Sequence, residues 1–158
     1  MKFLDNIAHV DADQIVDIDG MVQNADDFLA KDGYALRGQD SVRTQIIIDA
    51  TFAVHAAFTS LGFLHWKIFE ETVDHSDVAE FINELAPLLT ANSVGLFENA
   101  LNQRTNDIRN AINNAFAGKY FYCAAYSPHL KPIEHAFFLV RNYIQTCDQD
   151  LDYINNPE

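Results

Sequence analysis

The sequence predicts an α/β fold in which helices cover a mixed β-sheet. Short apolar segments rich in β-branched and aromatic residues alternate with segments whose apolar residues recur every three or four positions, as in strands and helices. Strand signals come first, and helix, strand, helix, strand and helix signals follow, an order that implies parallel strands joined by right-handed crossovers. With 158 residues and 49% hydrophobic content, the chain can form one core, so we expect a single domain over residues 1–158.

Three strands are predicted in the first half of the chain. Residues 15–19 form a short apolar run that ends at Gly20, which suits a strand buried on at least one face. Residues 46–58 and 63–70 are rich in β-branched and aromatic side chains and are separated by Thr-Ser-Leu-Gly. These two segments predict a hairpin that turns around Gly62.

A helix and a strand follow the hairpin. Apolar residues between positions 78 and 89 recur at helical spacing, with Ser76 as the expected N-cap. Pro87 is expected to distort the last turn of this helix. Residues 93–97 then predict a strand that ends at Glu98.

The last third of the chain predicts two helices with a strand between them. Residues 105–116 place apolar side chains on one helical face, and Gly118 stops that helix. Residues 120–124 predict another strand. Pro132 suits the first turn of the final helix, because its missing N–H has no helical partner there. Residues 148–158 are expected to be a polar tail.

The net charge limits the classes of partner. The chain has 23 acidic and 10 basic residues, a formal charge of −13, so its surface repels phosphate at long range. A role on nucleic acid would need a local basic strip or a separate basic module. No apolar run approaches the roughly 20 residues needed to span a bilayer, and the first residues lack the features of a secretory signal. We therefore expect an intracellular protein, in the nucleus of a eukaryote or the cytoplasm of a bacterium, with no membrane partner.

Three carboxylates are placed where they could meet. Asp19 ends the first strand, Glu98 ends the strand that follows the first long helix, and Glu134 opens the last helix. Sites in such sheets usually lie at the carboxyl ends of strands. Three acids in one small volume would repel and raise one another's pKa, and a divalent cation such as Mg²⁺ or Mn²⁺ is the natural solution. Two such ions about 3.5 to 4 Å apart can support phosphoryl transfer.

Each acid also has a simpler interpretation. Asp19 could be an ordinary strand-end residue, Glu98 a solvated turn acid, and Glu134 a group that favours the helix macrodipole. Asp17 lies two residues before Asp19 on the same strand face and is an alternative ligand.

Several segments resemble the DDE transposases of the mariner superfamily and their bacterial insertion-sequence relatives. YSPHLKPIEHAFFLV resembles the signature Y-S-P-D-L-N-P-I-E-x-x-W-x-x-L that carries the last acid of that family. LFENALNQRT resembles the strand end hydrophobic-D-N-A that carries the second acid, and IVDIDGM resembles the end of the first strand. The segment ALRGQ resembles the R-G-x segment that follows it. The resemblance covers a core of about residues 14–145.

The resemblance implies an RNase H-like fold, with a mixed five-stranded sheet whose first three strands are antiparallel and which is flanked by helices. It implies a DNA endonuclease and strand transferase that uses two Mg²⁺ or Mn²⁺ ions. Asp19, Glu98 and Glu134 match the three acids, which are both the catalytic residues and the metal ligands. DNA is the expected partner, bound weakly through this domain alone, and a homodimer is a candidate assembly. The candidate DNA contacts are Arg37, Asn99, Arg104, Lys131, His135 and Arg141.

The chain departs from the family pattern at positions that matter for activity. Glu98 stands where the family has Asp, Lys131 where it has Asn, and Phe137 where it has Trp. A longer carboxylate displaces the ligand by about one bond, and displacements of about 1 Å can cost on the order of 10²-fold in rate. A second hypothesis is therefore a domesticated or catalytically decayed module that serves as a binding, assembly or effector domain.

Overall fold

A computed structural model describes residues 5, 7–24, 36–38, 51–70, 72–98, 105–123 and 130–155, the last eleven of these by backbone alone. Its centre is a five-stranded sheet in the order β3-β2-β1-β4-β5. β1 pairs with β2, and β2 with β3, in antiparallel fashion, whereas β1–β4 and β4–β5 are parallel. The predicted mixed sheet, antiparallel over its first three strands, is confirmed. The strands are β1 (Ile15–Asn24), β2 (Thr51–Thr59), β3 (Gly62–Phe69), β4 (Val94–Phe97) and β5 (Tyr120–Tyr122).

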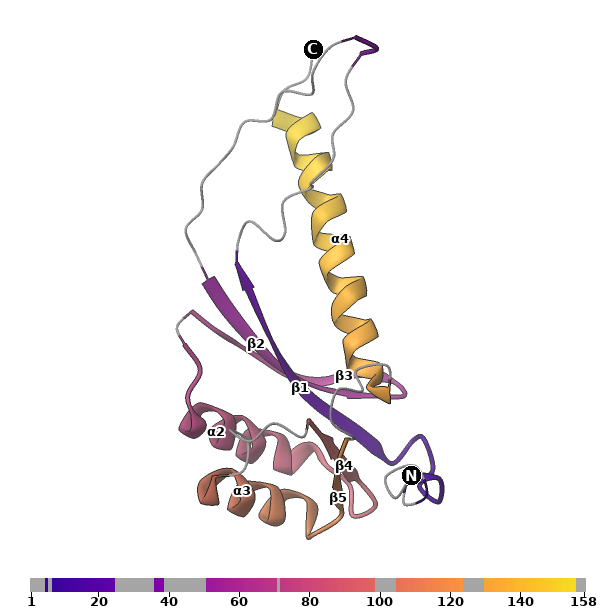
Figure 1. Cartoon of the computed structure of the whole chain (residues 1–158), viewed down its shortest axis with the longest axis vertical. Coiled ribbons are helices and arrows are strands. Elements are labelled where there is room, and N and C mark those ends of the chain that lie inside the picture. Colours follow the sequence, from indigo (N-terminus) through magenta and orange to yellow (C-terminus); the bar gives the residue numbers. More distant parts are fainter. Residues whose placement is uncertain are drawn as a thin grey trace.

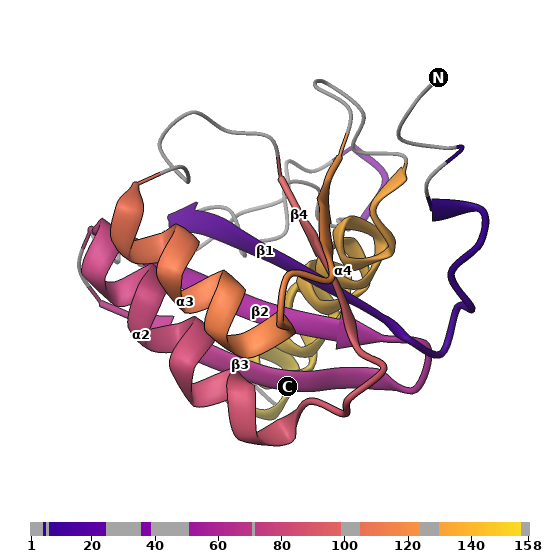
Figure 2. The same ribbon diagram turned by 90° about the horizontal axis from the view of Figure 1, so that it is seen from below.

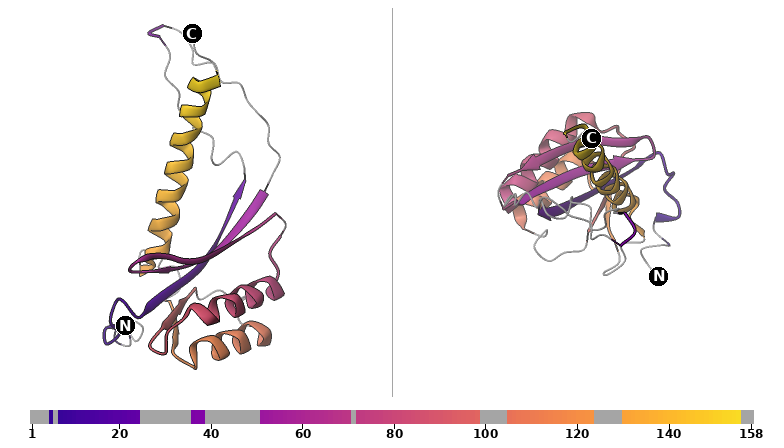
Figure 3. Two further views of the ribbon diagram at one scale, coloured as in Figure 1. Left: turned by 180° about the vertical axis from the view of Figure 1, so that it is seen from behind. Right: turned by 90° about the horizontal axis from the view of Figure 1, so that it is seen from above.

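Helices cover both faces of the sheet. α2 (His75–Leu85), which continues into the short 3₁₀ helix η2 (Ala86–Leu88), packs with α3 (Asn106–Phe116) on one face (Figure 2). α4 (Pro132–Asn155) crosses the other face and continues beyond the sheet (Figures 1 and 3). No helix within the described ranges combines the length and apolarity needed to cross a membrane.

Strand alternation divides the buried residues between the two faces. Val16, Ile18 and Ala57 belong to the main core with α2 and α3, and five of the seven largest fully buried side chains lie there. Ala56 packs instead against Ile133 and Phe137 of α4. Because successive residues of a strand point to opposite faces, the residues of β1 between Val16 and Gly20 alternate in the same way. Asp17 and Asp19 therefore share the α4 face.

Some predicted boundaries need correction. Gly20 does not end the first strand, because β1 continues to Asn24 along β2. Gly20 pairs with His55, and a Cβ atom at position 20 would meet the His55 ring at 2.7 Å, so the glycine permits a close approach within the sheet. The predicted polar tail is also wrong in part, since α4 runs to Asn155. Residues 46–50 of the predicted hairpin lie outside the described part of the chain.

Other local predictions are confirmed. Gly62 turns the β2–β3 hairpin with a φ of 118°, a value that glycine adopts without steric cost. Pro87 lies in the 3₁₀ turn that ends the first long helix, and this change of helix type is the expected distortion. The helix after Thr105 ends at Phe116, followed by Ala117 and Gly118 with positive φ. The last predicted strand is shorter than expected and ends at Tyr122 within the described residues.

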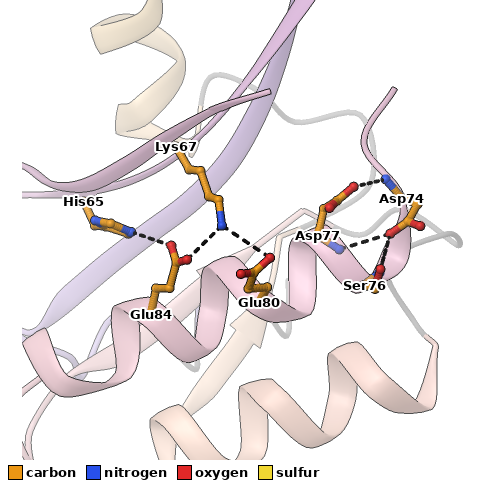
Figure 4. A network of polar contacts seen from close by, with 7 residues as sticks. All are labelled: His65, Lys67, Asp74, Ser76, Asp77, Glu80 and Glu84. Carbon is orange, nitrogen blue, oxygen red and sulfur yellow. Dashed lines mark hydrogen bonds and ion pairs between the residues drawn. The ribbon is translucent and has the colours of Figure 1, made fainter. Parts of the chain in front are cut away.

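The N-cap of α2 is Asp74, not the predicted Ser76. Asp74 Oδ1 accepts hydrogen bonds from the backbone N–H groups of Ser76 and Asp77, at 2.7 and 3.0 Å, and from the Ser76 hydroxyl at 2.7 Å (Figure 4). Asp77 returns the bond by accepting from the Asp74 N–H at 2.9 Å, which completes a capping box. These bonds, led by that from the Ser76 hydroxyl, lower the pKa of Asp74 below its ordinary value.

Replacing Asp74 by alanine is expected to lower Tm by about 2–4 °C at neutral pH, because two helix N–H groups lose their acceptor. The folded-state pKa is lowered, so the difference from wild type should persist at neutral pH and disappear as pH falls below 3.8. Thermal melts followed by circular dichroism measure it. The matched control is Asn83→Ala, on the exposed side of the same helix, which should leave Tm within about 1 °C. Equal melting of the two variants would contradict the assigned cap.

Candidate active site

Strand register places Asp19 beside Glu98. In the parallel β1–β4 pair, Ile18 lies opposite Phe97, and these are the last paired residues. Asp19 and Glu98 are the next residue of each strand, at the point where β1 leaves β4 and continues along β2. Asp19 is 6% exposed, whereas Glu98 is exposed. Both residues line a pocket of about 270 Å³ beside α2 and α3.

Two buried contacts fasten the start of α4 to β1. The backbone N–H of Ile133 donates to Asp17 Oδ2 at 3.0 Å. The Lys131 Nζ atom donates to Asp19 Oδ2 at 2.6 Å and to the Ile18 carbonyl at 3.1 Å. Glu134 follows directly in the first turn of the helix. The sequence places Pro132 between these contacts, where a helix N-terminus tolerates it.

Glu134 lies within electrostatic range of the other two acids. Partial burial raises its pKa above the ordinary value, and the negative charges of Asp19 and Glu98 raise it further. Lys131 and Arg141 oppose this shift. The structure thus places Asp19 and Glu98 side by side where β1 and β4 part, with Glu134 within range of both charges.

The buried Asp17 carboxylate, which the sequence indicated only as an alternative ligand, binds the start of α4. The residue is 1% exposed, and its Oδ2 atom supplies the hydrogen-bond acceptor at the start of α4. Its Oδ1 atom makes no hydrogen bond and lies 3.6 Å from Lys131 Nζ. Burial raises the pKa of Asp17 to about 6, against the opposing effect of the Lys131 charge. Asp17, and not Glu134, therefore provides the side-chain cap of α4.

Lys131 occupies a different place from that expected of a DNA contact. It is 4% exposed, and its ammonium group points into the protein, where it pairs with Asp19 and Asp17. A surface strip for phosphate needs exposed bases. The internal ion pair thus corrects the expectation that this lysine lies on such a strip.

The remaining candidate DNA contacts are dispersed. Arg141 lies on α4 near enough to lower the pKa of Glu134, and its Nε atom is buried without a hydrogen-bond partner. His135 is exposed on the same helix and stacks on Phe138, with ring centroids 6.2 Å apart. Arg37 is exposed. Asn99 and Arg104 lie outside the described residues.

Phe137 keeps an aromatic anchor where the family signature has tryptophan. It is 4% exposed and stacks on Phe63 of β3, with ring centroids 6.3 Å apart. It also packs with Ala56 and Ile133 on the α4 face. This contact and the Asp17 cap together fix the start of α4, and hence the position of Glu134.

Within the described ranges, no three His, Cys, Asp or Glu side chains form a ready-made group for holding a metal ion. Asp19 is held by Lys131 and by a hydrogen bond from the Gly20 N–H, whereas Glu98 and Glu134 are exposed. Exposed glutamates can change rotamer without disturbing the core. A shared cation would therefore require the two glutamates to turn toward Asp19.

The strand order, with α2 and α3 on one face and α4 on the other, is that of the predicted RNase H-like fold. Among solved structures, the fold matches that of the Mos1 mariner transposase catalytic domain, which confirms the predicted fold.

Three Mos1 structures illustrate the likeness. A pre-cleavage Mos1 transpososome has a TM-score of 0.69 and 17% identity over 96% of this chain and 51% of that chain. The Mos1 mariner paired-end complex with Mn has a TM-score of 0.68 and 18% identity over the same shares. The isolated catalytic domain of Mos1 mariner transposase has a TM-score of 0.62 and 14% identity over 92% of this chain and 65% of that one.

The chain spans about half the length of the transposase in the two complexes. At these identities the likeness is one of fold. No protein-family model matches the sequence, and no curated protein matches it either.

Proposed function

We propose that this chain is the catalytic domain of a DDE-type transposase, a metal-dependent DNA endonuclease and strand transferase. The observation that supports this proposal most is that Asp19 and Glu98 follow the last paired residues of β1 and β4, with Glu134 near enough for both charges to raise its pKa. Mutual repulsion of this kind is what a bound cation relieves. We assign the three acids as catalytic residues and metal ligands.

The donor set fits a hard divalent cation. All three side chains offer carboxylate oxygens, which Mg²⁺ and Mn²⁺ prefer. The Mos1 structures with this fold include complexes with Mg and with Mn. Lys131 is the only base bonded to the cluster within the described residues, so negative charge remains for a cation to balance. When bound, such an ion would activate a water or a 3′-hydroxyl and stabilise the leaving oxygen of a phosphodiester.

The chain's own residues set the geometry. The Asp17 bond to the Ile133 N–H fixes where α4 begins, and so fixes the backbone of Glu134. Lys131 holds Asp19 Oδ2 in one position. Glu98 is exposed at the rim, where a phosphodiester could approach it. Preorganised charges of this kind are the usual source of catalysis in phosphoryl transfer.

DNA is the proposed partner, and its binding through this domain alone is expected to be weak, since the overall charge of −13 repels phosphate. Arg37, Asn99, Arg104, His135 and Arg141 stay candidate contacts, and a homodimer stays a candidate assembly. We further propose that residues 1–158 act as one domain with a core of about 14–145. An intracellular location would follow from the DNA substrate.

The second candidate function is a catalytically decayed module that binds or assembles with other proteins. The first of two observations that favour it is that the buried Lys131 ammonium already neutralises Asp19, which in an active site would be a cation ligand. The strongly acidic surface also suits a basic partner better than DNA.

Nicking of supercoiled plasmid DNA separates the two functions. The purified chain, incubated with Mg²⁺ or Mn²⁺, should convert supercoiled to open-circular DNA, and excess EDTA should stop the reaction. No nicking with either ion, in a preparation shown to be folded, would support the decayed module instead.

Shortening Glu98 to aspartate is expected to raise the nicking rate about tenfold or more, because the shorter side chain matches the family's second acid and small displacements change rates strongly. Initial rates of plasmid nicking in Mn²⁺ measure the effect. The matched control is Glu84→Asp on α2, whose carboxylate pairs with Lys67 and His65 away from the site, and it should leave the rate unchanged. Equal rates for Glu98→Asp and wild type would argue that Glu98 is not a ligand.

A further inference from the structure

The ammonium group of Lys131 is a cation built into the acidic cluster. It lies 2.6 Å from Asp19 Oδ2 and 3.6 Å from Asp17 Oδ1, and it also donates to the Ile18 carbonyl. The side chain is almost completely buried, as are both carboxylates. Charged groups removed from water in this way interact strongly and are stable only when paired.

The cluster has more negative charge than this one ammonium balances. Besides Asp17 and Asp19, it includes Glu98, which follows the last paired residue of β4, and Glu134, which follows Lys131 and Ile133 at the start of α4. The buried Asp17 Oδ1 atom has no hydrogen-bond partner, which is a second sign that the charge is incompletely compensated. The carboxylates can therefore bind a further cation. Because Lys131 already balances one negative charge, they can bind less positive charge than the same carboxylates would without the lysine.

A second divalent ion would compete with Lys131 for the same oxygen. Mg²⁺ binds its oxygen ligands at about 2.0–2.1 Å, and the ammonium already lies on Asp19 Oδ2. Like charges a few ångströms apart inside a protein repel strongly. With the ammonium in place, a second divalent ion would have to displace it from Asp19 Oδ2.

We propose that Lys131 supplies, from within the chain, the positive charge of a second divalent ion, so that the acidic cluster binds one ion where the family resemblance implies two. The inference rests on the proposed function, since it concerns the cation site of the same three acids. Lys131 is thus a positioning residue, which holds Asp19 and lets this part of the fold form without metal. Glu98, Glu134 and Asp19 hold the single ion.

Counting bound Mn²⁺ on the full chain tests this inference without an activity assay. Titration calorimetry, and the loss of free-Mn²⁺ signal in electron paramagnetic resonance, should both give one ion per wild-type chain. The Lys131→Asn variant should bind two. In EDTA it should melt about 10 °C below wild type, because buried Asp17 and Asp19 lose their partner, and Mn²⁺ should restore most of that loss.

A second variant guards against simple misfolding of the first. Lys131→Asn combined with Asp17→Asn removes one buried carboxylate together with the ammonium, while the new amide oxygen can still accept from the Ile133 N–H. It should fold in EDTA and bind two Mn²⁺ ions. The matched control is Lys67→Met, which breaks a lysine–carboxylate pair on the far face of the sheet (Figure 4) and should bind one ion as wild type does.

The outcomes separate this inference from the proposed function. Two ions on the wild-type chain, or one ion on both the wild-type chain and the folded double variant, would overturn the role of Lys131 and leave the metal-dependent nuclease standing. No ion on wild type with one on the double variant would support the built-in cation and count against metal-dependent catalysis. No Mn²⁺ on any of the proteins would overturn both.

Discussion

Replacement of Glu134 by glutamine is expected to lower Mn²⁺-dependent plasmid nicking by on the order of 10²–10³-fold, the usual cost of removing one charge-stabilising group from an active site. The amide has nearly the same size as the carboxylate, so packing at the start of α4 should be preserved. What the variant lacks is the negative charge that, with those of Asp19 and Glu98, attracts the cation. Initial nicking rates at saturating Mn²⁺ measure the loss.

A stability measurement distinguishes loss of chemistry from loss of fold. Glu134 is repelled by Asp19 and Glu98, so in EDTA the Glu134→Gln variant should melt no lower than wild type. Glu80→Gln is the matched control, because Glu80 is an exposed helical glutamate paired with Lys67 away from the site. It should nick DNA at the wild-type rate. Undiminished nicking by Glu134→Gln would exclude Glu134 from the chemistry.

The order of strands and helices could be predicted from the sequence because it follows from the spacing of apolar residues. Alternation in the strands, the 3.6-residue period in α2 and α3, and the glycine at Gly62 are local signals, and each produced the expected element. Boundaries were less predictable where tertiary contact decided them. Gly20 is a typical strand breaker in isolation, yet pairing with β2 carries β1 four residues past it, to Asn24.

The hypothesis that the three acids form one site could be made from the sequence, because strand ends and a helix start are visible there and the Y-S-P…P-I-E signature marks the last acid. That they form one site stays a prediction. The buried network beneath them could not be predicted. From the sequence alone, Lys131 is indistinguishable from a surface lysine. Its partner Asp19 is 112 positions away in the chain, so no local pattern predicts the ion pair. A signal did exist: Asp17 and Asp19 lie in an apolar strand segment, where they alternate with the buried Val16 and Ile18, and buried carboxylates require a partner.

Truncating Asp17 to alanine is expected to lower the free energy of unfolding by about 1–3 kcal/mol. The Ile133 N–H would lose its buried acceptor, and a buried donor left unsatisfied typically costs this much. The substitution also leaves Lys131 with Asp19 as its one remaining carboxylate partner among the described residues. Urea denaturation followed by circular dichroism, in EDTA, measures the change. Because the start of α4 carries Glu134, nicking should fall together with stability.

The Asp17→Asn variant separates the hydrogen bond that Asp17 makes to α4 from its ion pair with Lys131. The asparagine side chain retains an acceptor for the Ile133 N–H but carries no charge. In the wild-type protein, burial disfavours the charged carboxylate and raises the pKa of Asp17 to about 6. Removing that buried charge while keeping the hydrogen bond should therefore leave stability within about 1 kcal/mol of wild type. A loss equal to that of Asp17→Ala would show that the ion pair with Lys131, and not the bond to α4, is what Asp17 contributes.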